Sequence, residues 1–157
     1  MLTFDDALAH LLAVAQRLPD EHVPLDEAAG RVLAEDVRAD RDQPPFAKAA
    51  MDGWACRRAD LPGPLRLIGE IPAGAAPTRA LQPGECASIM TGAPLPDGAD
   101  CVLMLEHGQC ADGLVTGDGT RTADNFCPLG EDARAGDVLL RAGSRLGPVH
   151  LAVLASA

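Results

Sequence analysis

Proline and glycine recur along the whole chain, from Pro19 to Pro148, and they limit the length of any regular element. The 157 residues include 16 glycines and 13 prolines. Proline removes a backbone donor and glycine weakens helices, so residues of both types spread along a chain favour short strands joined by turns. The sequence therefore predicts many short strands and few helices.

Helical patterns occur near the two ends of the chain. Residues 3–18 place leucines at helical spacing behind a capping threonine, and a proline ends the pattern. We expect a short helix at 26–34 and another at 147–157 with proline in its first turn. The last pattern stays apolar up to the final residue, which suggests that a further domain follows.

Strand patterns dominate the middle of the chain. Asp112-Gly113 is typical of a tight hairpin turn, and we expect it to join a strand at 101–106 to one at 114–116. Cys86 and Cys101 lie in apolar surroundings and are expected to be small core residues. The other segments expected to form strands are 35–39 and 65–71. Residues 81–90 are expected to form a turn that leads into a strand, and residues 135–146 a strand, a glycine turn and another short strand.

The charge and the cysteine pattern exclude several classes of function. A net charge of −10 leaves no basic surface for nucleic acid or anionic lipid. No apolar run approaches the roughly 20 residues that span a bilayer, and the acidic start lacks a signal peptide, so we expect a cytoplasmic protein. The five cysteines and four histidines show no metal-ligand spacing, so no metal site is expected.

Residues 44–54 (PPFAKAAMDGW) contain the only lysine and the only tryptophan of the chain. Phe46 and Trp54 provide apolar area for anchoring, and Asp52-Gly53 suits a tight turn with an exposed carboxylate. Such a turn is either a structural corner or the floor of a site. Two further turns, at 90–94 and 130–132, also combine a bendable backbone with a hydroxyl or carboxylate.

The three turns together could hold a divalent cation, orient water or bind ligand hydroxyl groups. Their spacing does not establish that they meet. No dinucleotide loop, phosphate loop or nucleophile elbow accompanies them, so the residues alone leave the reaction open.

Four motifs in order resemble the N-terminal part of the molybdopterin molybdenumtransferases, the MoeA and gephyrin E-domain family. Residues 50–55 (AMDGWA) are similar to the family turn A-M-D-G-aromatic-A, and residues 89–100 (IMTGAPLPDGAD) to I-M-T-G-A-P-x-P-x-G-A-D. The remaining matches are EAAGRVLAEDV at 27–37 and GED at 130–132, followed by Gly-Asp at 136–137 and GSRL at 143–146. The resemblance covers nearly the whole chain.

The resemblance implies an enzyme that joins molybdate to adenylylated molybdopterin, giving molybdenum cofactor and releasing AMP. It implies a homodimer, with magnesium (Mg2+) and the pterin nucleotide bound mainly by a later domain of the full-length enzyme. We therefore expect no ligand to bind tightly to this chain alone, and no catalysis by it. The residues that the resemblance assigns to catalysis are Asp52, Thr91 and Asp132, and those assigned to cofactor binding are Lys48, Gly53, Gly92 and Glu131.

Two departures from the family pattern stand close to these residues. The usual run F-D-N-S-A-M-D-G is here FAKAAMDG, so Ala47, Lys48 and Ala49 replace an Asp, an Asn and a Ser. The usual Arg two residues after Asn125 is replaced by Cys127. An anionic substrate favours positive and hydrogen-bonding groups, and Lys48 could compensate in part. The departures favour an alternative, a non-catalytic family member that acts as a dimerisation, cofactor-carrying or partner-binding module.

The resemblance also implies the architecture. We expect a mainly β chain with a few helices and bent, irregular sheets, arranged in two lobes. The segments are an N-terminal helix at 1–19, an inner lobe from 20–40 and 134–157, and an outer β lobe at 41–133. The exposed leucines of the first helix would favour self-association.

Overall fold

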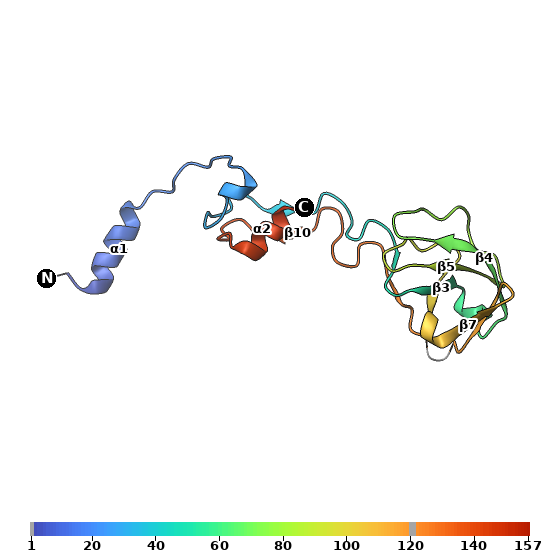
Figure 1. The fold of residues 1–157 in the computed structure, drawn as a ribbon. Coiled ribbons are helices and arrows are strands. Elements are labelled where there is room, and N and C mark those ends of the chain that lie inside the picture. The colour runs from blue at the N-terminus through green and yellow to red at the C-terminus, as the bar shows by residue number, and fades with distance from the viewer. Residues whose placement is uncertain (1, 120–121) are drawn as a thin grey trace. The chain divides into compact units, whose positions relative to one another are not determined.

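The computed structural model describes residues 2–119 and 122–157 (Figure 1). It divides into two compact units, Met1–Asp36 with Leu140–Ser156 and Val37–Leu139, and each is described by itself. The content is mainly strands with two α-helices, which confirms the expected fold class. The lobe boundaries given above stay a prediction, and residue 1 of the expected N-terminal segment lies outside the described residues.

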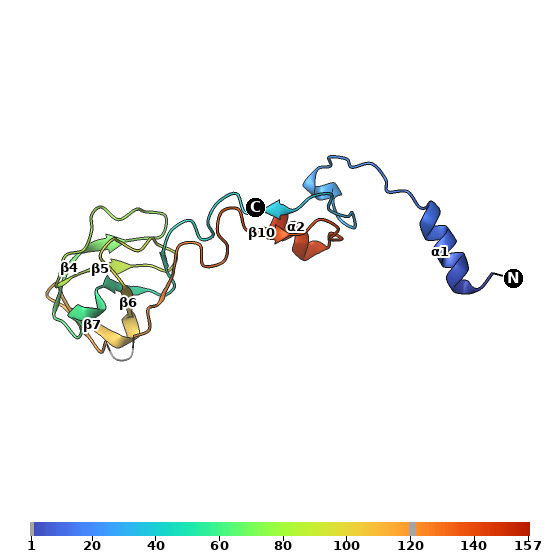
Figure 2. The same ribbon diagram turned by 180° about the vertical axis from the view of Figure 1, so that it is seen from behind.

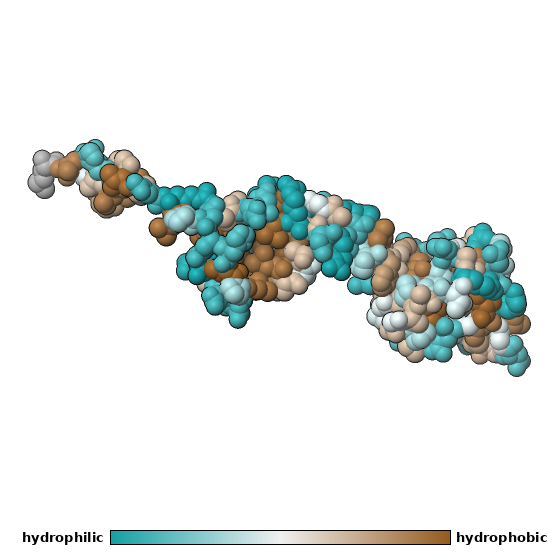
Figure 3. Space-filling view, turned by 90° about the horizontal axis from the view of Figure 1, so that it is seen from above, coloured by the Kyte–Doolittle hydropathy of each residue, from teal (hydrophilic) through white to brown (hydrophobic). Residues whose placement is uncertain are grey.

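Helix α1 of the first unit (Phe4–Val14) starts where the sequence predicts. The Thr3 hydroxyl accepts a hydrogen bond from the Asp6 N–H at 3.2 Å, and the Asp6 carboxylate accepts one from the Thr3 N–H, which forms a capping box. The helix ends at Val14, four residues before the expected end at 18. None of its residues is buried, and the space-filling view shows apolar surface on it (Figure 3). Without a buried face, only local interactions hold the last turn.

The helix expected at 26–34 is wrong. A single 3-10 turn, η1 (Leu25–Glu27), stands there instead. Gly30 adopts a φ of 78°, and its N–H donates to the Leu146 carbonyl at 2.8 Å, so the backbone leaves the helical path for a partner distant in sequence. Helix α2 (Pro148–Leu154) confirms the expected start, with proline in its first turn.

The second unit is built around a six-stranded sheet (Figures 1 and 2). Its strand order is β6 (Cys101–Met104), β3 (Gly53–Cys56), β5 (Glu85–Ile89), β4 (Leu65–Ile71), β8 (Leu114–Gly117) and β7 (Gly108–Ala111). Two-stranded pairs join β1 (Val37–Arg38) to β10 (Val138–Leu140) and β2 (Lys48–Ala49) to β9 (Phe126–Cys127). Two 3-10 turns, η2 (Arg58–Asp60) and η3 (Leu105–His107), complete the unit.

The core lies on both faces of this sheet. Side chains alternate along a strand, so Trp54 and Cys56 of β3 join one apolar cluster while Ala55 joins the other. All four residues of β3 are buried. The cluster that contains Ala55 also contains Ala49 of β2 and Ala93, so the core anchors the segments that carry two of the predicted site turns.

The hairpin turn is confirmed, but the strand that precedes it is not the one predicted. Asp112 and Gly113 have φ values of 50° and 76°, as a two-residue hairpin turn requires. The turn joins β7 to β8, with Ala111 opposite Leu114. The chain leaves β6 through η3, and β6 lies at the opposite edge of the sheet from β7. Apolar composition alone could not distinguish these two partners.

Candidate functional site

Asp52 lies in the turn that joins β2 to β3, and Gly53 fixes where that turn ends. A Cβ built on Gly53 would collide with the Leu103 carbonyl oxygen, and it would stand 3.0 Å from Cγ1 of Val102. Strand β3 therefore approaches β6 at a distance that only glycine allows. Gly53 is buried in the sheet, whereas Asp52 is exposed.

The Asp52 carboxylate is held by Thr91. The Thr91 N–H donates to Asp52 Oδ1 at 2.7 Å and the Thr91 hydroxyl donates to the same oxygen at 2.8 Å. The backbone N–H first, and the hydroxyl second, hold the pKa of Asp52 below its usual value. Because both bonds end on Oδ1, Oδ2 stays available to a ligand. The pair is therefore a fixed, ionised acceptor at the surface.

The turn that carries Thr91 is attached to one edge of β2. The Gly92 N–H donates to the Ala49 carbonyl at 2.8 Å, and the Ala49 N–H donates to the Ala93 carbonyl at 2.9 Å. Gly92 has a φ of 83°, and a Cβ there would meet no atom within 4 Å. Glycine is needed at this position for its backbone angle and not for space.

The third predicted turn is attached to the segment that leads into β2. Strand β9 pairs antiparallel with β2, and the Gly130 N–H donates to the Pro44 carbonyl at 2.9 Å. The Asp132 N–H donates to the Gln43 carbonyl at 2.8 Å. All three turns are therefore tied by backbone hydrogen bonds to one continuous segment, residues 43–53.

Lys48 lies opposite Cys127 in the β2–β9 register, and it also bridges to Pro94. The Glu131 carboxylate, which accepts a hydrogen bond from the Cys127 thiol, raises the pKa of Cys127. Burial and the Asp132 carboxylate also raise this pKa, and the positive charge of Lys48 lowers it. Lys48, Glu131 and Asp132 therefore share one electrostatic neighbourhood. Lys48 forms none of the ion pairs found among the described residues.

The predicted site residues thus form two groups. Asp52 and Thr91 are in direct contact. Lys48 lies opposite Cys127, and the charges of Lys48, Glu131 and Asp132 all act on the pKa of that thiol. No hydrogen bond between these groups occurs within residues 2–119 and 122–157. Their connection is through the backbone of β2.

The sequence interpretation missed exposed apolar side chains beside the polar ones. Met51 precedes Asp52 and Met90 precedes Thr91, and their exposed fractions are 39% and 44%. Leu129, near Glu131 in sequence, is also exposed. Phe46 is exposed as well, so the expectation that it anchors the turn is wrong, whereas Trp54 is buried as expected. The sequence shows a large apolar residue next to each of these polar residues, but it does not show whether that apolar side chain is buried or exposed.

Two classes of feature are not found in the described part of the chain. No group of three or more His, Cys, Asp or Glu residues could hold a metal ion there. Among the described helices, none is long and apolar enough to cross a membrane.

Comparison with known proteins gives consistent results. The family described as "MoeA N-terminal region (domain I and II)" matches residues 2–157. Proteins named molybdopterin molybdenumtransferase from Haemophilus influenzae and Bacillus subtilis are 39% and 35% identical over 99% and 97% of the chain. The match covers 40% and 38% of those relatives, so the chain spans about two fifths of their length.

Solved structures agree with the family match. The chain resembles the molybdopterin biosynthesis MoeA protein of Pyrococcus horikoshii OT3 with a TM-score of 0.89 and 35% identity. That match covers 99% of this chain and 43% of the other.

Proposed function

The chain belongs to the family of MoeA N-terminal regions, and from this premise we propose that it forms one side of the active site of a molybdopterin molybdenumtransferase. In this proposal it contributes to joining molybdate to adenylylated molybdopterin, with release of AMP. The remaining part of the site belongs to sequence that the relatives have beyond the matched two fifths.

The observation that carries the proposal is the Asp52 carboxylate held by Thr91. A carboxylate with a lowered pKa is a weak base, so Asp52 positions a hydrogen-bond donor and does not remove a proton at neutral pH. The pterin ring presents an edge of N–H donors, which fits a fixed acceptor. Asp52 is thus proposed to touch the substrate, with Thr91 as its positioning residue.

The neighbouring side chains support the same type of ligand. The exposed Met51 and Met90, which flank Asp52 and Thr91 in sequence, provide adaptable apolar contacts for a flat ring. Lys48, half-buried and outside the described ion pairs, is proposed to attract the phosphates of the substrate. Gly92, Glu131 and Asp132 are proposed to line the site around it, and Gly53 to set the position of the turn.

Magnesium does not fit the described residues of this chain, because they provide no cluster of ligands. The role of magnesium in the full-length enzyme stays a prediction. The homodimer and the cytoplasmic location are likewise proposals. The exposed leucines of α1 support self-association, and the net charge of −10 argues against nucleic acid as a partner.

One observation bears on the second candidate, a non-catalytic binding or dimerisation module. Lys48 and Cys127, which depart from the family pattern, face each other across β2 and β9. Both departures therefore fall at one location. This is consistent with a positive side chain on β2 that replaces the family's Arg on β9, and equally with a site that binds a ligand without catalysis.

A fusion protein separates the two candidates. Residues 1–157 would be joined to the part of the Haemophilus influenzae relative that follows its matched segment. We expect molybdate-dependent AMP release from adenylylated molybdopterin by the fusion and none by the 157-residue chain alone. A folded fusion that binds substrate but releases no AMP would contradict the transferase proposal and favour the binding module.

A further inference from the structure

Three cysteines form a row across the second unit. Cys56 of β3 lies opposite Cys101 of β6 and also opposite Cys86 of β5 in the antiparallel registers. All three side chains are fully buried free thiols in one apolar cluster. The sequence had indicated core positions for Cys86 and Cys101, but only the strand pairing shows that the thiols are neighbours.

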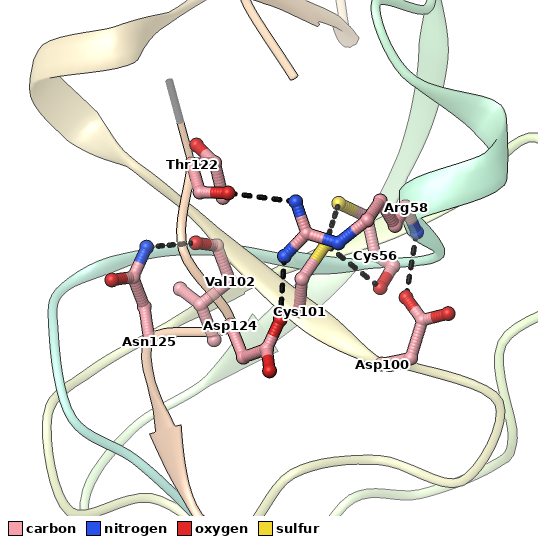
Figure 4. Close-up of polar contacts among 8 residues, drawn as sticks. All are labelled: Cys56, Arg58, Asp100, Cys101, Val102, Thr122, Asp124 and Asn125. Carbon is pink, nitrogen blue, oxygen red and sulfur yellow. Dashed lines mark hydrogen bonds and ion pairs between the residues drawn. The ribbon is translucent and has the colours of Figure 1, made fainter. Parts of the chain in front are cut away.

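Cys56 and Cys101 are in direct contact. Their Sγ atoms are 3.6 Å apart, and Cys101 Sγ also lies 3.7 Å from the Cys56 carbonyl oxygen, to which it donates (Figure 4). Residues directly opposite in antiparallel strands have Cβ atoms about 4.5–5.5 Å apart, close to the 3.5–4.5 Å of disulfides. A bond between the two sulfurs, about 2.05 Å long, therefore requires only a small approach of the strands.

Arg58 lies beside this pair and makes several contacts (Figure 4). Its Nη1 donates to the Thr122 carbonyl at 2.7 Å, and its Nη2 donates to Asp124 Oδ1 at 2.8 Å. The Asp124 carbonyl in turn accepts from the Val102 N–H at 2.9 Å. Residues 122–125 therefore cover the outer edge of β6, and Arg58 holds them there.

The charges distinguish the two thiols. The hydrogen bond from Cys56 lowers the pKa of Cys101, and the positive charge of Arg58 lowers it further, whereas burial and the Asp100 carboxylate oppose this shift. The hydrogen bond that the Cys56 thiol donates to Cys101 raises the pKa of Cys56, and burial raises it further. Burial raises the pKa of Cys86 to about 12.

We propose that Cys56 and Cys101 are a modification site, a dithiol that a hydroperoxide converts into a reversible disulfide linking β3 to β6. The Cys101 thiolate attacks one peroxide oxygen, the O–O bond breaks, and the departing hydroxide takes a proton to become water. The resulting sulfenic acid is attacked by the Cys56 sulfur, and the S–O bond breaks as the S–S bond forms. The second water leaves with the Cys56 proton.

Electrons and atoms balance in this reaction. Two thiols lose two electrons and two protons, and one hydrogen peroxide is reduced to two water molecules. Peroxide reaches the buried sulfurs by opening of the sheet edge, because β6 is the terminal strand of the sheet and, among the described residues, Asp124 and Asn125 hydrogen-bond to Val102 on its outer side. The site is independent of the proposed transferase activity.

The test uses the 157-residue chain with hydrogen peroxide as the probe, in a Cys110→Ser, Cys127→Ser background that removes the less buried thiols. We expect peptide mapping to find a Cys56–Cys101 linked peptide that disappears on treatment with dithiothreitol. Cys101→Ala should abolish it. Cys86→Ala, an equally buried cysteine of the same row, should leave it unchanged.

Two results would overturn the proposal. One is a Cys56–Cys86 link as the main product. The other is the absence of any Cys56–Cys101 link after prolonged treatment of the folded background protein with hydrogen peroxide. That protein keeps both cysteines, so the result does not depend on whether a Cys56 or Cys101 variant folds. Oxidation of the folded chain should also accelerate in urea below the unfolding transition, because edge opening limits access.

Discussion

Replacing Gly53 by alanine tests how the sheet positions the site turn. The added Cβ would stand 2.9 Å from the Leu103 carbonyl carbon and 3.0 Å from Cγ1 of Val102, well inside the 3.5–4.0 Å of favourable carbon contacts. Because the colliding atoms include backbone of the neighbouring strand, they cannot rotate away. Overpacking of this kind costs about 1–3 kcal/mol, and we expect Gly53→Ala to lie near the upper end of that range.

Gly92→Ala is a matched control for this prediction. Its Cβ would meet open space, so only the φ of 83° is strained, at a cost of about 1 kcal/mol. Urea unfolding followed by the fluorescence of Trp54, the single tryptophan and a buried residue of β3, would measure both variants. A Gly53→Ala protein that is as stable as the parent, or more stable than Gly92→Ala, would show that β3 does not need glycine at this approach to β6.

Three further predictions concern stability, pH and association. The Cys56–Cys101 disulfide would close a loop of 45 residues, so the oxidised chain should be more stable in urea by about 4 kcal/mol than the reduced chain. The Arg79 side chain first, with the Gln82 N–H, lowers the pKa of Glu85 to about 2 from 4.5, so its contribution is present above pH 4.5 and lost as the pH falls toward 2. Glu85→Gln should therefore show a shallower acid loss of stability than the parent in urea titrations at several pH values. The chain should self-associate in sedimentation experiments through α1, and Leu12→Lys, at a side chain exposed to 67%, should reduce that association.

The sequence predicts those elements that hydrophobic pattern, proline position or turn residues determine within a short segment. Strand β4 and the start of α2 follow from local pattern and proline position. The hairpin turn is predicted because its two central residues need a positive φ, which the Asp112-Gly113 pair adopts readily. The helix expected at 26–34 fails because Gly30 is bonded to Leu146, more than a hundred residues away, and no local pattern reports such a partner.

The candidate site shows the same division. Asp52 and Thr91 could be chosen from their motifs, but their hydrogen bond depends on the pairing of β3 with β5, which spacing does not give. The thiol pair was missed for a similar reason. The sequence indicates an ordinary core residue at Cys101 and gives no role to Cys56, and only the register of β3 and β6 places the two opposite each other.

In the proposed function, the Asp52 carboxylate faces the substrate of a molybdenum-inserting enzyme. Asp52→Asn removes the charge and keeps the shape, and Asp112→Asn makes the same change at an exposed hairpin turn. In the fusion protein, we expect Asp52→Asn to slow molybdenum insertion roughly tenfold or more, as loss of a charge-assisted hydrogen bond would, while Asp112→Asn has no effect. Equal rates for Asp52→Asn and the parent fusion would contradict the account.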